Sequence, residues 1–575
     1  MKQLYNFITI KQPPYRWVVR EDIKRLINQA LIGRETNLQA RQVLKDNNAR
    51  TLFFTTIPFL GEVFVKQYKL NDWWSILKAS WWRSQAMNEL LMAKYLHNRD
   101  VLSVQPLAVL EKKKWGFTVD AFLVLEKINN ALTLKDFFSQ PLGGTSGPGM
   151  FPEMSDYLVR QDILKRLGQL VRQAHQVNFF HKDLHLGNVL LTFSFQPACT
   201  TMDIGAGREE PQLYLIDLHR SLVAGGLSDI RKIYNLAQMS YSINLVCPFT
   251  DVIRFLKAYR QFDFRPPVFR KLVRRIAVLM EKFRLRHYAS RAKRCLKDSS
   301  EFMVYRDDRY KIFMRRGTTP GKIMELIEKH KNFVQQAPGK LFKHSIGRSI
   351  SVQSWDEEAK IFIKEYRYSF MSRLKNLFRR PAARRSWVAA RGLALRRINT
   401  PEPLSLVESR PGGVGNSYLF LKEIPDARPA NQFVIKFFEK ISSPVELIKE
   451  KKKFVKQMAE AVRSLHRQGV FHADLKANNI LVGVEGGEPL FYFVDLDRVE
   501  FLREVKWSQR IKNLAQLNAA MPAALTRADR LRFFNEYSRA LPGYEASQKK
   551  DLIKRIMKIT IARHHLWPRS FGQIS

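Results

Sequence analysis

One short pattern of polar residues occurs twice in the chain, at His181–Leu191 (HKDLHLGNVLL) and at His472–Val482 (HADLKANNILV). Each copy reads H-x-D-L-x-x-x-N and continues with three aliphatic residues. An apolar segment follows each copy and ends in an aspartate, Asp217 or Asp495. This is the spacing of a phosphotransferase catalytic loop, in which the first aspartate accepts the proton of an attacking hydroxyl.

The same spacing provides ligands for a hard cation. Mg²⁺ prefers oxygen ligands, and one carboxylate and one amide on neighbouring segments suffice beside nucleotide phosphates. The pattern therefore predicts Asp183 and Asp474 as catalytic bases. It predicts two magnesium sets, Asn188 with Asp217 and Asn479 with Asp495. A single match can arise by chance in an apolar sequence, but two matches, each with its downstream aspartate, are a strong signal.

The nucleotide side of such a site needs a lysine on a strand. Strand-like residues at Thr51–Leu60 precede the alternating run Val63–Lys69, which carries Lys66 and predicts contact with the α- and β-phosphates. Trp81–Leu96 has helical periodicity and contains Glu89, a candidate ion-pair partner that would orient Lys66. Lys69 is the alternative lysine. The plainer interpretation is a solvent-facing lysine and a surface glutamate.

The remaining expected elements lie around these residues in both halves. Ala121–Ile128 and Asn416–Ile424 predict strands that lead from a nucleotide-binding lobe to a helical lobe, with Glu126 and Glu423 as candidate nucleotide contacts at their ends. Lys364 repeats the strand lysine within Ala359–Tyr366. The similar run Phe433–Lys436 ends only 36 residues before His472, too close for the intervening elements.

Several further segments are assigned without chemistry. Helices are expected over Asp156–Val177 and Val445–Gln468, each leading into a catalytic loop, and a third, basic one around Glu21–Leu44. Pro141–Pro152 is rich in Gly, Pro and Ser and predicts a loop. His181 and His472 are expected to brace their loops rather than to react.

The repeat extends beyond the catalytic loops. Asn-Leu-Ala-Gln begins at Asn235 and again at Asn513, 18 residues after Asp217 and Asp495 respectively. Arg-Phe pairs at 254 and 532, and tyrosines at 259 and 537, recur in the same register. These agreements predict two copies of one fold. The expected class is α+β: two tandem, two-lobed protein-kinase-like domains at 1–299 and 300–575, each with a small β-rich lobe and a helical lobe.

The composition indicates a globular protein with anionic partners. The 575 residues include 97 Lys and Arg against 53 Asp and Glu, a net charge of +44. Three cysteines without a paired spacing suit a reducing cytoplasm. We expect no signal peptide and no membrane span; Ile233–Thr250, the most apolar stretch, is interpreted as core helix and loop.

A second basic feature is the acid-free segment Tyr366–Pro401, with ten Lys and Arg interleaved with apolar residues. It predicts either a solvated helix face or a patch that contacts an anionic membrane surface. No motif of a nucleic-acid reader is present, so we expect no nucleic acid as a partner.

The chain resembles the Kdo/WaaP lipopolysaccharide kinase family in the two H-x-D-L motifs, the D-L-H-R and D-L-D-R continuations and the repeated N-L-A-Q. Ser290–Leu296 and Asn399–Leu404 also fit. The resemblance implies transfer of the γ-phosphoryl of ATP, with Mg²⁺, to a sugar hydroxyl of the lipopolysaccharide inner core. It implies a protein on the cytoplasmic face of the inner membrane. Lys476 would add charge at the transferred phosphoryl, and His185 takes that place in the first copy.

The sequence departs from the family pattern in two respects. Neither copy has a convincing glycine-rich phosphate loop, and Ile346-Gly-Arg-Ser is the best remnant. The second copy has no acidic partner for Lys364 between Tyr366 and Pro401. Two alternatives therefore stay open: a protein or small-molecule kinase, and a membrane-associated scaffold of two pseudokinase domains.

Overall fold

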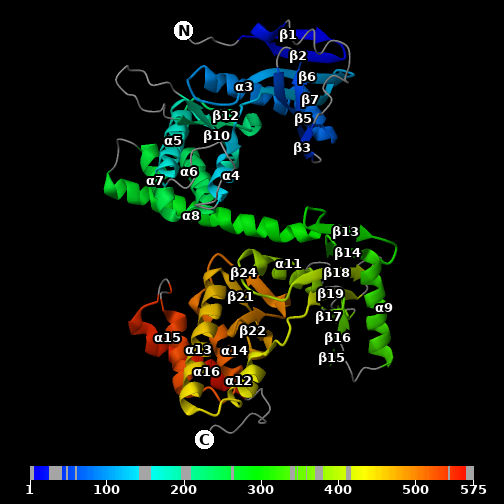
Figure 1. Ribbon diagram of the computed structural model, residues 1–575, viewed down its shortest axis with the longest axis vertical. Helices are drawn as coiled ribbons and strands as arrows, with labels where there is room; N and C mark the ends of the chain where they lie inside the picture. The colour runs from blue at the N-terminus through cyan, green and yellow to red at the C-terminus, as the bar shows by residue number, and fades with distance from the viewer. Residues whose placement is uncertain are drawn as a thin grey trace. The chain divides into compact units, whose positions relative to one another are not determined.

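The computed structural model describes residues 6–24, 42–46, 49–57, 61–140, 157–195, 209–260, 265–336, 343–345, 347–357, 359–369, 380–409, 416–539, 541 and 544–564. The chain divides into two compact units, 1–284 and 285–575 (Figure 1). The division falls inside a long helix, and the boundary at residue 299 stays a prediction. No helix among the described residues is long and apolar enough to cross a bilayer.

The small lobe of the first unit is a seven-stranded antiparallel sheet. Its spatial order is β1 (Phe7–Gln12), β2 (Tyr15–Arg20), β6 (Pro106–Lys114), β7 (Phe117–Glu126), β5 (Gly61–Lys69), β4 (Arg50–Ile57) and β3 (Gln42–Asp46). Two helices follow β5, α2 (Trp73–Trp81) and α3 (Gln85–His97). Helix α3 begins at Ser84, whose hydroxyl accepts a hydrogen bond from the Met87 backbone as an N-cap.

Side-chain alternation along β5 separates core from site. Val63 and Val65 are buried on one face, among Trp17, Ile57 and their neighbours. Tyr68 is buried on the opposite face, against α3. Because residues two apart on a strand point the same way, Lys66 lies on the α3 face with Tyr68.

The large lobe of the first unit is mainly helical. Its elements are α4 (Leu134–Ser139), α5 (Tyr157–Gln176), α6 (Asp229–Asn244), α7 (Phe249–Arg260) and α8 (Pro266–Ala292), with the small sheets β8 (Leu132–Thr133), β10 (Val189–Phe195), β11 (Glu209–Leu215) and β9 (Phe179–Phe180), β12 (Leu222–Val223). The 3-10 turns of this lobe are η3 (Leu186–Asn188) and η4 (Leu218–Arg220); η1 (Glu21–Ile23) lies in the small lobe, and η5 (Lys293–Leu296) belongs to the second unit.

The second unit repeats this topology. Its seven-stranded sheet has the order β13 (Phe302–Arg306), β14 (Tyr310–Arg315), β18 (Pro403–Ser409), β19 (Ser417–Lys422), β17 (Lys360–Tyr366), β16 (Arg348–Ser354) and β15 (Lys343–Ser345), with helices α9 (Pro320–Gln336) and α11 (Ala382–Leu395). The helices of the large lobe are α12 (Ala430–Phe438), α13 (Pro444–Arg467), α14 (Trp507–Ala520), α15 (Arg527–Ser538) and α16 (Lys549–His564). Its 3-10 turns are η7 (Ala477–Asn479), η8 (Leu496–Arg498) and η9 (Ala546–Gln548). One small sheet consists of β20 (Arg428–Pro429), β22 (Ile480–Glu485) and β23 (Glu488–Phe493), and the other of β21 (Val470–His472) and β24 (Val499–Phe501).

The predicted α+β class with two tandem kinase-like domains is confirmed, as are the lysine strands and the helices that lead into both loops. Phe433–Lys436 lies in helix α12, so its exclusion as a strand was right. Pro141–Pro152 lies outside the described residues.

Two element predictions need correction. Trp81–Leu96 is not one helix, because α2 ends at Trp81 and Ser84 caps a new helix. The helix expected around Glu21–Leu44 is wrong at both of its ends: residues 21–23 form a 3-10 turn and 42–44 belong to β3, whereas Lys24 is helical and residues 25–41 lie outside the described part.

The basic segment Tyr366–Pro401 also differs from its interpretation as a surface patch. Residues 370–379 lie outside the described part, and most of the remainder is α11. Trp387 and Leu393 on this helix are fully buried, and the Trp387 indole donates to the Cys295 carbonyl at 3.0 Å. Arg384 and Arg391 pair with Glu408 and Glu301. Helix α11 is therefore a core helix of the second unit.

Candidate functional site

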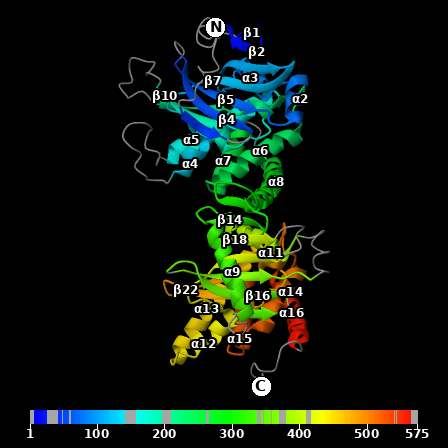
Figure 2. The ribbon, with the colours of Figure 1, turned by 90° about the vertical axis from the view of Figure 1, so that its right-hand side faces the viewer.

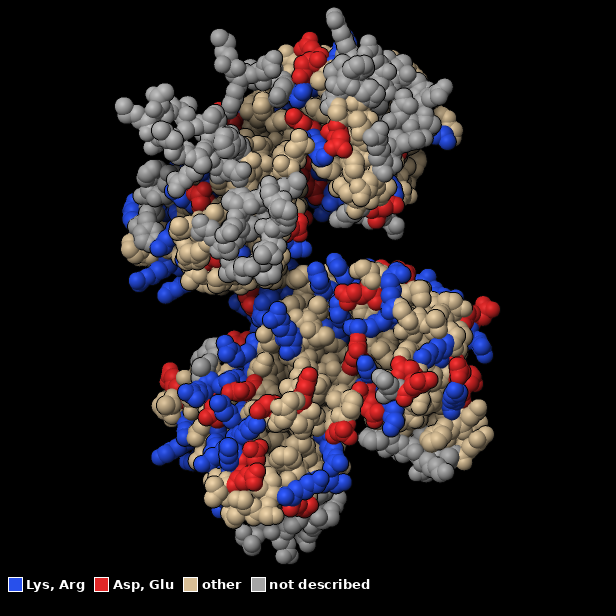
Figure 3. Space-filling model, viewed as in Figure 1, with Lys and Arg blue, Asp and Glu red and all other residues tan. Residues whose placement is uncertain are grey.

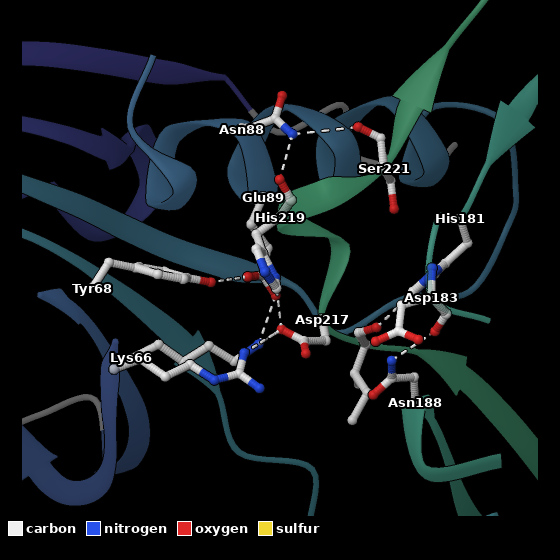
Figure 4. A network of polar contacts seen from close by, with 12 residues as sticks. Lys66, Tyr68, Asn88, Glu89, His181, Asp183, Asn188, Asp217, His219 and Ser221 are labelled. Carbon is white, nitrogen blue, oxygen red and sulfur yellow. Dashed lines mark hydrogen bonds and ion pairs between the residues drawn. The ribbon is translucent and has the colours of Figure 1, made fainter. Parts of the chain in front are cut away.

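A lysine–glutamate ion pair connects β5 to α3 in the first unit. Lys66 Nζ lies 2.7 Å from Glu89 Oε1, and the Tyr68 hydroxyl donates to Glu89 Oε2 at 2.5 Å (Figure 4). Glu89 is buried, so the ion pair and this hydrogen bond offset the cost of removing its charge from water. Burial first, and then the charge of Glu89, raise the pKa of Tyr68 well above its ordinary value. The predicted pairing of Lys66 with Glu89 is present; Lys69 instead pairs with Asp46.

Asp217 lies at the meeting point of three donors. Its Oδ1 is 2.7 Å from Arg50 Nη1, 2.9 Å from His219 Nδ1 and 3.6 Å from Lys66 Nζ. Burial by itself would raise the pKa of Asp217, but the bond with His219 and the charges of Lys66 and Arg50 hold it well below the usual range. All three contacts use Oδ1, which leaves Oδ2 as the oxygen that a cation could take.

Asp183 and Asn188 lie on the loop that precedes β10. Asn188 Nδ2 donates to the backbone oxygen of Asp183 at 2.8 Å (Figure 4). Because the amide nitrogen is engaged there, the amide oxygen is the atom available as a ligand. The Asp183 carboxyl is 61% exposed, as a base that must meet an incoming hydroxyl requires.

His181 braces this loop as expected. Its Nε2 lies 3.0 Å from the Ile216 carbonyl and its Nδ1 accepts from the Asp183 backbone at 3.2 Å. Burial lowers the pKa of His181, so the neutral ring can donate at Nε2 and accept at Nδ1. The loop before Asp183 is thereby fixed to the strand end before Asp217.

The repeated Asn-Leu-Ala-Gln motif holds the same loop from α6. Asn235 Nδ2 donates to the His181 carbonyl at 2.7 Å, and Gln238 Nε2 donates to the Lys182 carbonyl at 2.9 Å. His175 Nε2 lies 3.3 Å from Asn235 Oδ1, and its Nδ1 lies 2.9 Å from the Tyr259 hydroxyl. The asparagine, glutamine and tyrosine that recur at equal spacing in the two halves are thus residues that support the loop.

The second unit builds the same support. Asn513 donates to the His472 carbonyl at 2.7 Å and Gln516 to the Ala473 carbonyl at 2.8 Å. His466 lies 3.0 Å from Asn513 and 2.7 Å from the Tyr537 hydroxyl. Asn479 Nδ2 donates to the Asp474 backbone oxygen at 2.8 Å, as its counterpart does.

The nucleotide side of the second unit differs. Lys364 Nζ lies 2.6 Å from Asp495 Oδ1, and Arg348 contacts both Asp495 at 3.2 Å and Asp497 at 2.6 Å. Burial opposes ionisation of Asp495, but Lys364 lowers its pKa to about 2. Ser386 takes the place of Glu89 in α11, since its hydroxyl lies 3.3 Å from that of Tyr366, as Glu89 meets Tyr68. We predicted that the helix after the lysine strand would offer Lys364 no acidic partner, and α11 indeed carries Ser386 at that place.

The other predicted site residues are placed as follows. Glu126 ends β7 and is exposed, with its backbone N–H donating to Gln105; Glu423 follows β19 and donates to Lys360. Lys476 Nζ lies 3.0 Å from Asp474 Oδ2, whereas His185 lies 3.8 Å from Asp183. Gly347 follows β15 and precedes β16, so the glycine remnant lies in the hairpin before the lysine strand.

Four residues of the candidate sites were missed from the sequence: Arg50 and Arg348, which contact the metal-candidate aspartates, and His175 and His466, which support the loops. Each arginine stands 16 residues before its strand lysine, and each histidine stands 6 residues before its loop histidine. Aligning the two halves at these positions would have found them. Glu89, Asp217 and His219 also offer ligand atoms within 4.8 Å of one another, but Lys66 neutralises that cluster.

A cavity of about 620 Å³ lies in front of Asp183. Its basic lining residues are Lys182, Arg220 and Arg231, and it is completed by Phe180, Ile230, Tyr234 and Gln238. A second cavity, of about 980 Å³, shares Lys182 and Arg220 and extends along α2 and the start of α3. Both present cationic side chains to whatever approaches the candidate base.

Two tandem domains, each with a strand lysine and a braced Asp–Asn–Asp set and the first with a helix glutamate as well, define a protein-kinase-like fold. The model of the lipopolysaccharide kinase (Kdo/WaaP) family matches residues 35–259 and 334–537, and the chain belongs to this family of kinases. No curated protein matches the chain.

Parts of the chain are similar, at low identity, to several solved structures. WaaP in complex with acyl carrier protein is 21% identical, with a TM-score of 0.34, covering 45% of this chain and 99% of that one. The Rio2 kinase–ADP/Mg²⁺-phosphoaspartate complex of Chaetomium thermophilum is 12% identical, with a TM-score of 0.26 and coverages of 48% and 81%. The PknI kinase domain of Mycobacterium tuberculosis is 16% identical, with a TM-score of 0.23 and coverages of 38% and 83%.

Proposed function

We propose that the first unit transfers the γ-phosphoryl of ATP to a sugar hydroxyl of the lipopolysaccharide core. The observation that carries this proposal is the Lys66–Glu89 pair facing the Asp183–Asn188–Asp217 set. Family membership supports the class of acceptor.

Each residue of this set has a role that its geometry supports. Lys66, oriented by Glu89, would neutralise the α- and β-phosphates, and Glu126 would lie at the inner edge of the nucleotide site. Asp217 Oδ2 and the Asn188 amide oxygen suit Mg²⁺, which would neutralise charge on the phosphates. Asp183 would accept the proton of the acceptor hydroxyl and align that oxygen for attack.

The cavity in front of Asp183 supports an anionic acceptor. Lys182, Arg220 and Arg231 line it from the catalytic loop, the turn after Asp217 and α6. A sugar that carries carboxylate or phosphate groups would be held by these cations while its hydroxyl meets Asp183.

We propose a supporting role for the second unit. Lys364 pairs with Asp495 rather than with a helix glutamate, and Lys476 pairs with Asp474, the candidate base. Ala473 and Gln509 replace Lys182 and Arg231 at the corresponding positions. Asn479 keeps its place, and Glu423 directly follows the corresponding strand β19, so this unit retains the framework of a site. These features favour a pseudokinase scaffold for this half.

The test measures Mg²⁺-dependent ATP turnover with and without purified lipopolysaccharide. It compares wild type with Asp183→Asn, Asp474→Asn and the double variant. We expect stimulation by lipopolysaccharide and loss of about a thousandfold or more in turnover for Asp183→Asn, as for removal of a catalytic base. Asp474→Asn should retain most activity.

Other outcomes select the alternatives. An absence of ATP turnover in all four proteins would contradict the enzyme proposal. Turnover that depends on Asp183 but yields a phosphorylated protein and no labelled lipopolysaccharide would replace the acceptor class. Greater loss with Asp474→Asn would exchange the roles of the two units.

A further inference from the structure

Five tryptophans of the first unit lie on its surface: Trp73, Trp74, Trp81 and Trp82 on and after α2, and Trp115 in the β6–β7 turn. Their exposed fractions are 63%, 80%, 74%, 77% and 88%. By contrast, Trp17 and Trp387 are buried. We call these five residues the tryptophan face. Tryptophan is a costly residue to leave in water, so five such side chains from two neighbouring elements indicate a surface that is covered in use.

The helix places its four indoles on one side. At 100° per residue, Trp73, Trp74 and Trp81 fall within about 100° of one another, and Trp82 follows about 80° further round. Ala79, on the opposite side, is buried, and Ser80 accepts a hydrogen bond from the Thr118 backbone at 2.8 Å, which fixes α2 to β7. Figure 2 shows α2 at the margin of the first unit.

The β6–β7 turn adds the fifth indole to the same region. The Trp73 ring lies 5.8 Å from that of Phe117, which begins β7 directly after the turn. Trp115 itself has φ 50°, a left-handed conformation that a bulky residue rarely adopts, beside Gly116 at φ 82°. Positive φ at both central residues is the geometry of a two-residue type I′ hairpin turn, so the turn itself accounts for it; the unusual feature is that the tip carries an 88% exposed indole rather than a small polar side chain.

The charges around these indoles are almost all positive. Lys78 and Arg83 lie among the α2 tryptophans and are exposed, and Lys113 and Lys114 precede Trp115. From residue 71 to 85 the one acid is Asp72, whose carboxylate caps α2 through the Ser75 backbone at 2.9 Å. Basic side chains are spread over the face drawn in Figure 3, but around α2 and the β6–β7 turn they are interleaved with exposed indoles.

We infer that the tryptophan face docks the protein onto an anionic lipid bilayer. Indoles favour the interfacial region of membranes, and lysine and arginine among them favour anionic headgroups. The indoles project from a helix surface and a turn tip, as interfacial anchors do; a protein partner is typically engaged by a central anchor in a closed pocket.

The face is continuous with the catalytic cleft. Trp81, Trp82, Lys78 and Arg83 also line the 980 Å³ cavity, which reaches Lys182 and Arg220 beside Asp183. If the proposed function holds, and this step rests on it, a lipid-anchored anionic acceptor would pass from the membrane surface along this cationic cavity to the base.

The experiment measures binding of the full chain to phosphatidylcholine vesicles with and without phosphatidylglycerol, by co-sedimentation and by indole quenching with brominated lipid. The variant combines Trp73→Ser, Trp74→Ser and Trp115→Ser, none of which lines the cavity. The control removes three exposed apolar residues of the second unit, Val445→Ser, Ile448→Ser and Val484→Ser. Circular dichroism verifies folding of both.

We expect wild type and control to bind vesicles that contain phosphatidylglycerol, with quenching, and the tryptophan variant to bind about tenfold or more weakly. Equal binding by the tryptophan variant, or no binding by wild type, would overturn the inference. So would a dimer, or a complex with an acidic protein such as acyl carrier protein, that the variant loses while vesicle binding is unchanged. Vesicle binding requires no ATP turnover. The docking inference can therefore hold or fail whether or not the proposed kinase activity is found.

Discussion

At the scale of single residues, the two units differ in which carboxylate holds the strand lysine. Lys66 Nζ lies 2.7 Å from Glu89 and 3.6 Å from Asp217, so its closer ion pair is with the helix glutamate. Lys364 has Ser386 where the glutamate would be, and its ammonium lies 2.6 Å from Asp495. An ammonium 2.6 Å from Asp495 repels a metal cation at the other carboxylate oxygen more strongly than the Lys66 ammonium does at 3.6 Å from Asp217.

Exchanging these residues should therefore exchange the behaviour of the sites. Glu89→Gln removes the negative charge that holds Lys66, so Lys66 should move to Asp217. We expect kcat/KM for ATP to fall about a hundredfold and the Mg²⁺ concentration for half-maximal turnover to rise. A Mg²⁺ titration of ATP turnover measures both.

Ser386→Glu is the matched change in the second unit. It should draw Lys364 from Asp495 and strengthen Mg²⁺–nucleotide binding there, read by fluorescent nucleotide titration in an Asp183→Asn background. A Glu89→Gln protein with unchanged Mg²⁺ dependence would show that the ion pair does not set the state of Asp217.

The candidate site residues that could be named from the sequence belong to local patterns, such as Asp183, Asn188 and Asp217; their roles stay predictions. The sequence also predicted Glu89, because one glutamate occurs at the proper distance on a helical run. Arg50 could not be found in this way, since its partner Asp217 is 167 positions away and their contact depends on how β4 approaches the turn after β11. Contacts between distant segments are set by tertiary packing, which periodicity in one segment does not report.

At the scale of elements, each catalytic loop is held by a buried histidine at the end of the preceding helix. His175 on α5 and His466 on α13 each contact an asparagine and a tyrosine. Burial lowers the pKa of His175 to about 4 and that of His466 to about 3, and the charges of Lys232 and Arg510 act in the same direction. Both rings are therefore neutral in the folded protein at neutral pH.

This produces a defined pH dependence of stability. An unfolded histidine has a pKa near 6.5, so between that value and the folded one the unfolded chain binds more protons. The free energy of unfolding should fall as pH drops below 6.5, by about 2 kcal/mol for each histidine at pH 5. His466→Gln should remove the His466 share of this fall, about 2 kcal/mol between pH 7 and pH 5, and leave the share of His472, whose pKa burial also lowers; denaturant unfolding at the two pH values measures the difference.

Tyr537→Phe is the control, because it removes the hydroxyl that His466 contacts at 2.7 Å while the imidazole can still titrate. It should keep the fall in stability between pH 7 and pH 5. A His466→Gln protein whose stability falls by as much as wild type over this range would refute the assignment.

Element predictions succeeded where one face of a segment is buried and failed where burial depends on a partner. The alternation in Val63–Lys69 and the periodicity of α13 mark buried faces directly. The hairpin β1–β2 was missed because its apolar residues become buried only when β2 pairs with β6, a strand far away in the sequence. Helix α11 was interpreted as surface because of its arginines, although Trp387 and Leu393 lie in the core.

At the scale of the whole molecule, the two units have separate hydrophobic cores. Among the described residues, each core cluster draws its members from one unit alone, the largest two from 92–283 and 389–559. Separate cores allow separate unfolding transitions, and a ligand that binds one folded unit raises the transition of that unit.

We therefore expect two transitions in calorimetry and a selective response to nucleotide. Trp387→Ala assigns them: this fully buried side chain belongs to the second unit, and its loss should cost about 3–5 kcal/mol there and lower only that transition. Mg²⁺ with a non-hydrolysable ATP analogue should raise the other transition by several degrees, and Glu89→Gln should reduce that rise. Because Lys364 is already bound to Asp495, the second transition should respond less. An equal rise of both transitions would show that the second unit binds nucleotide as well as the first, and would remove the structural argument for dividing their roles.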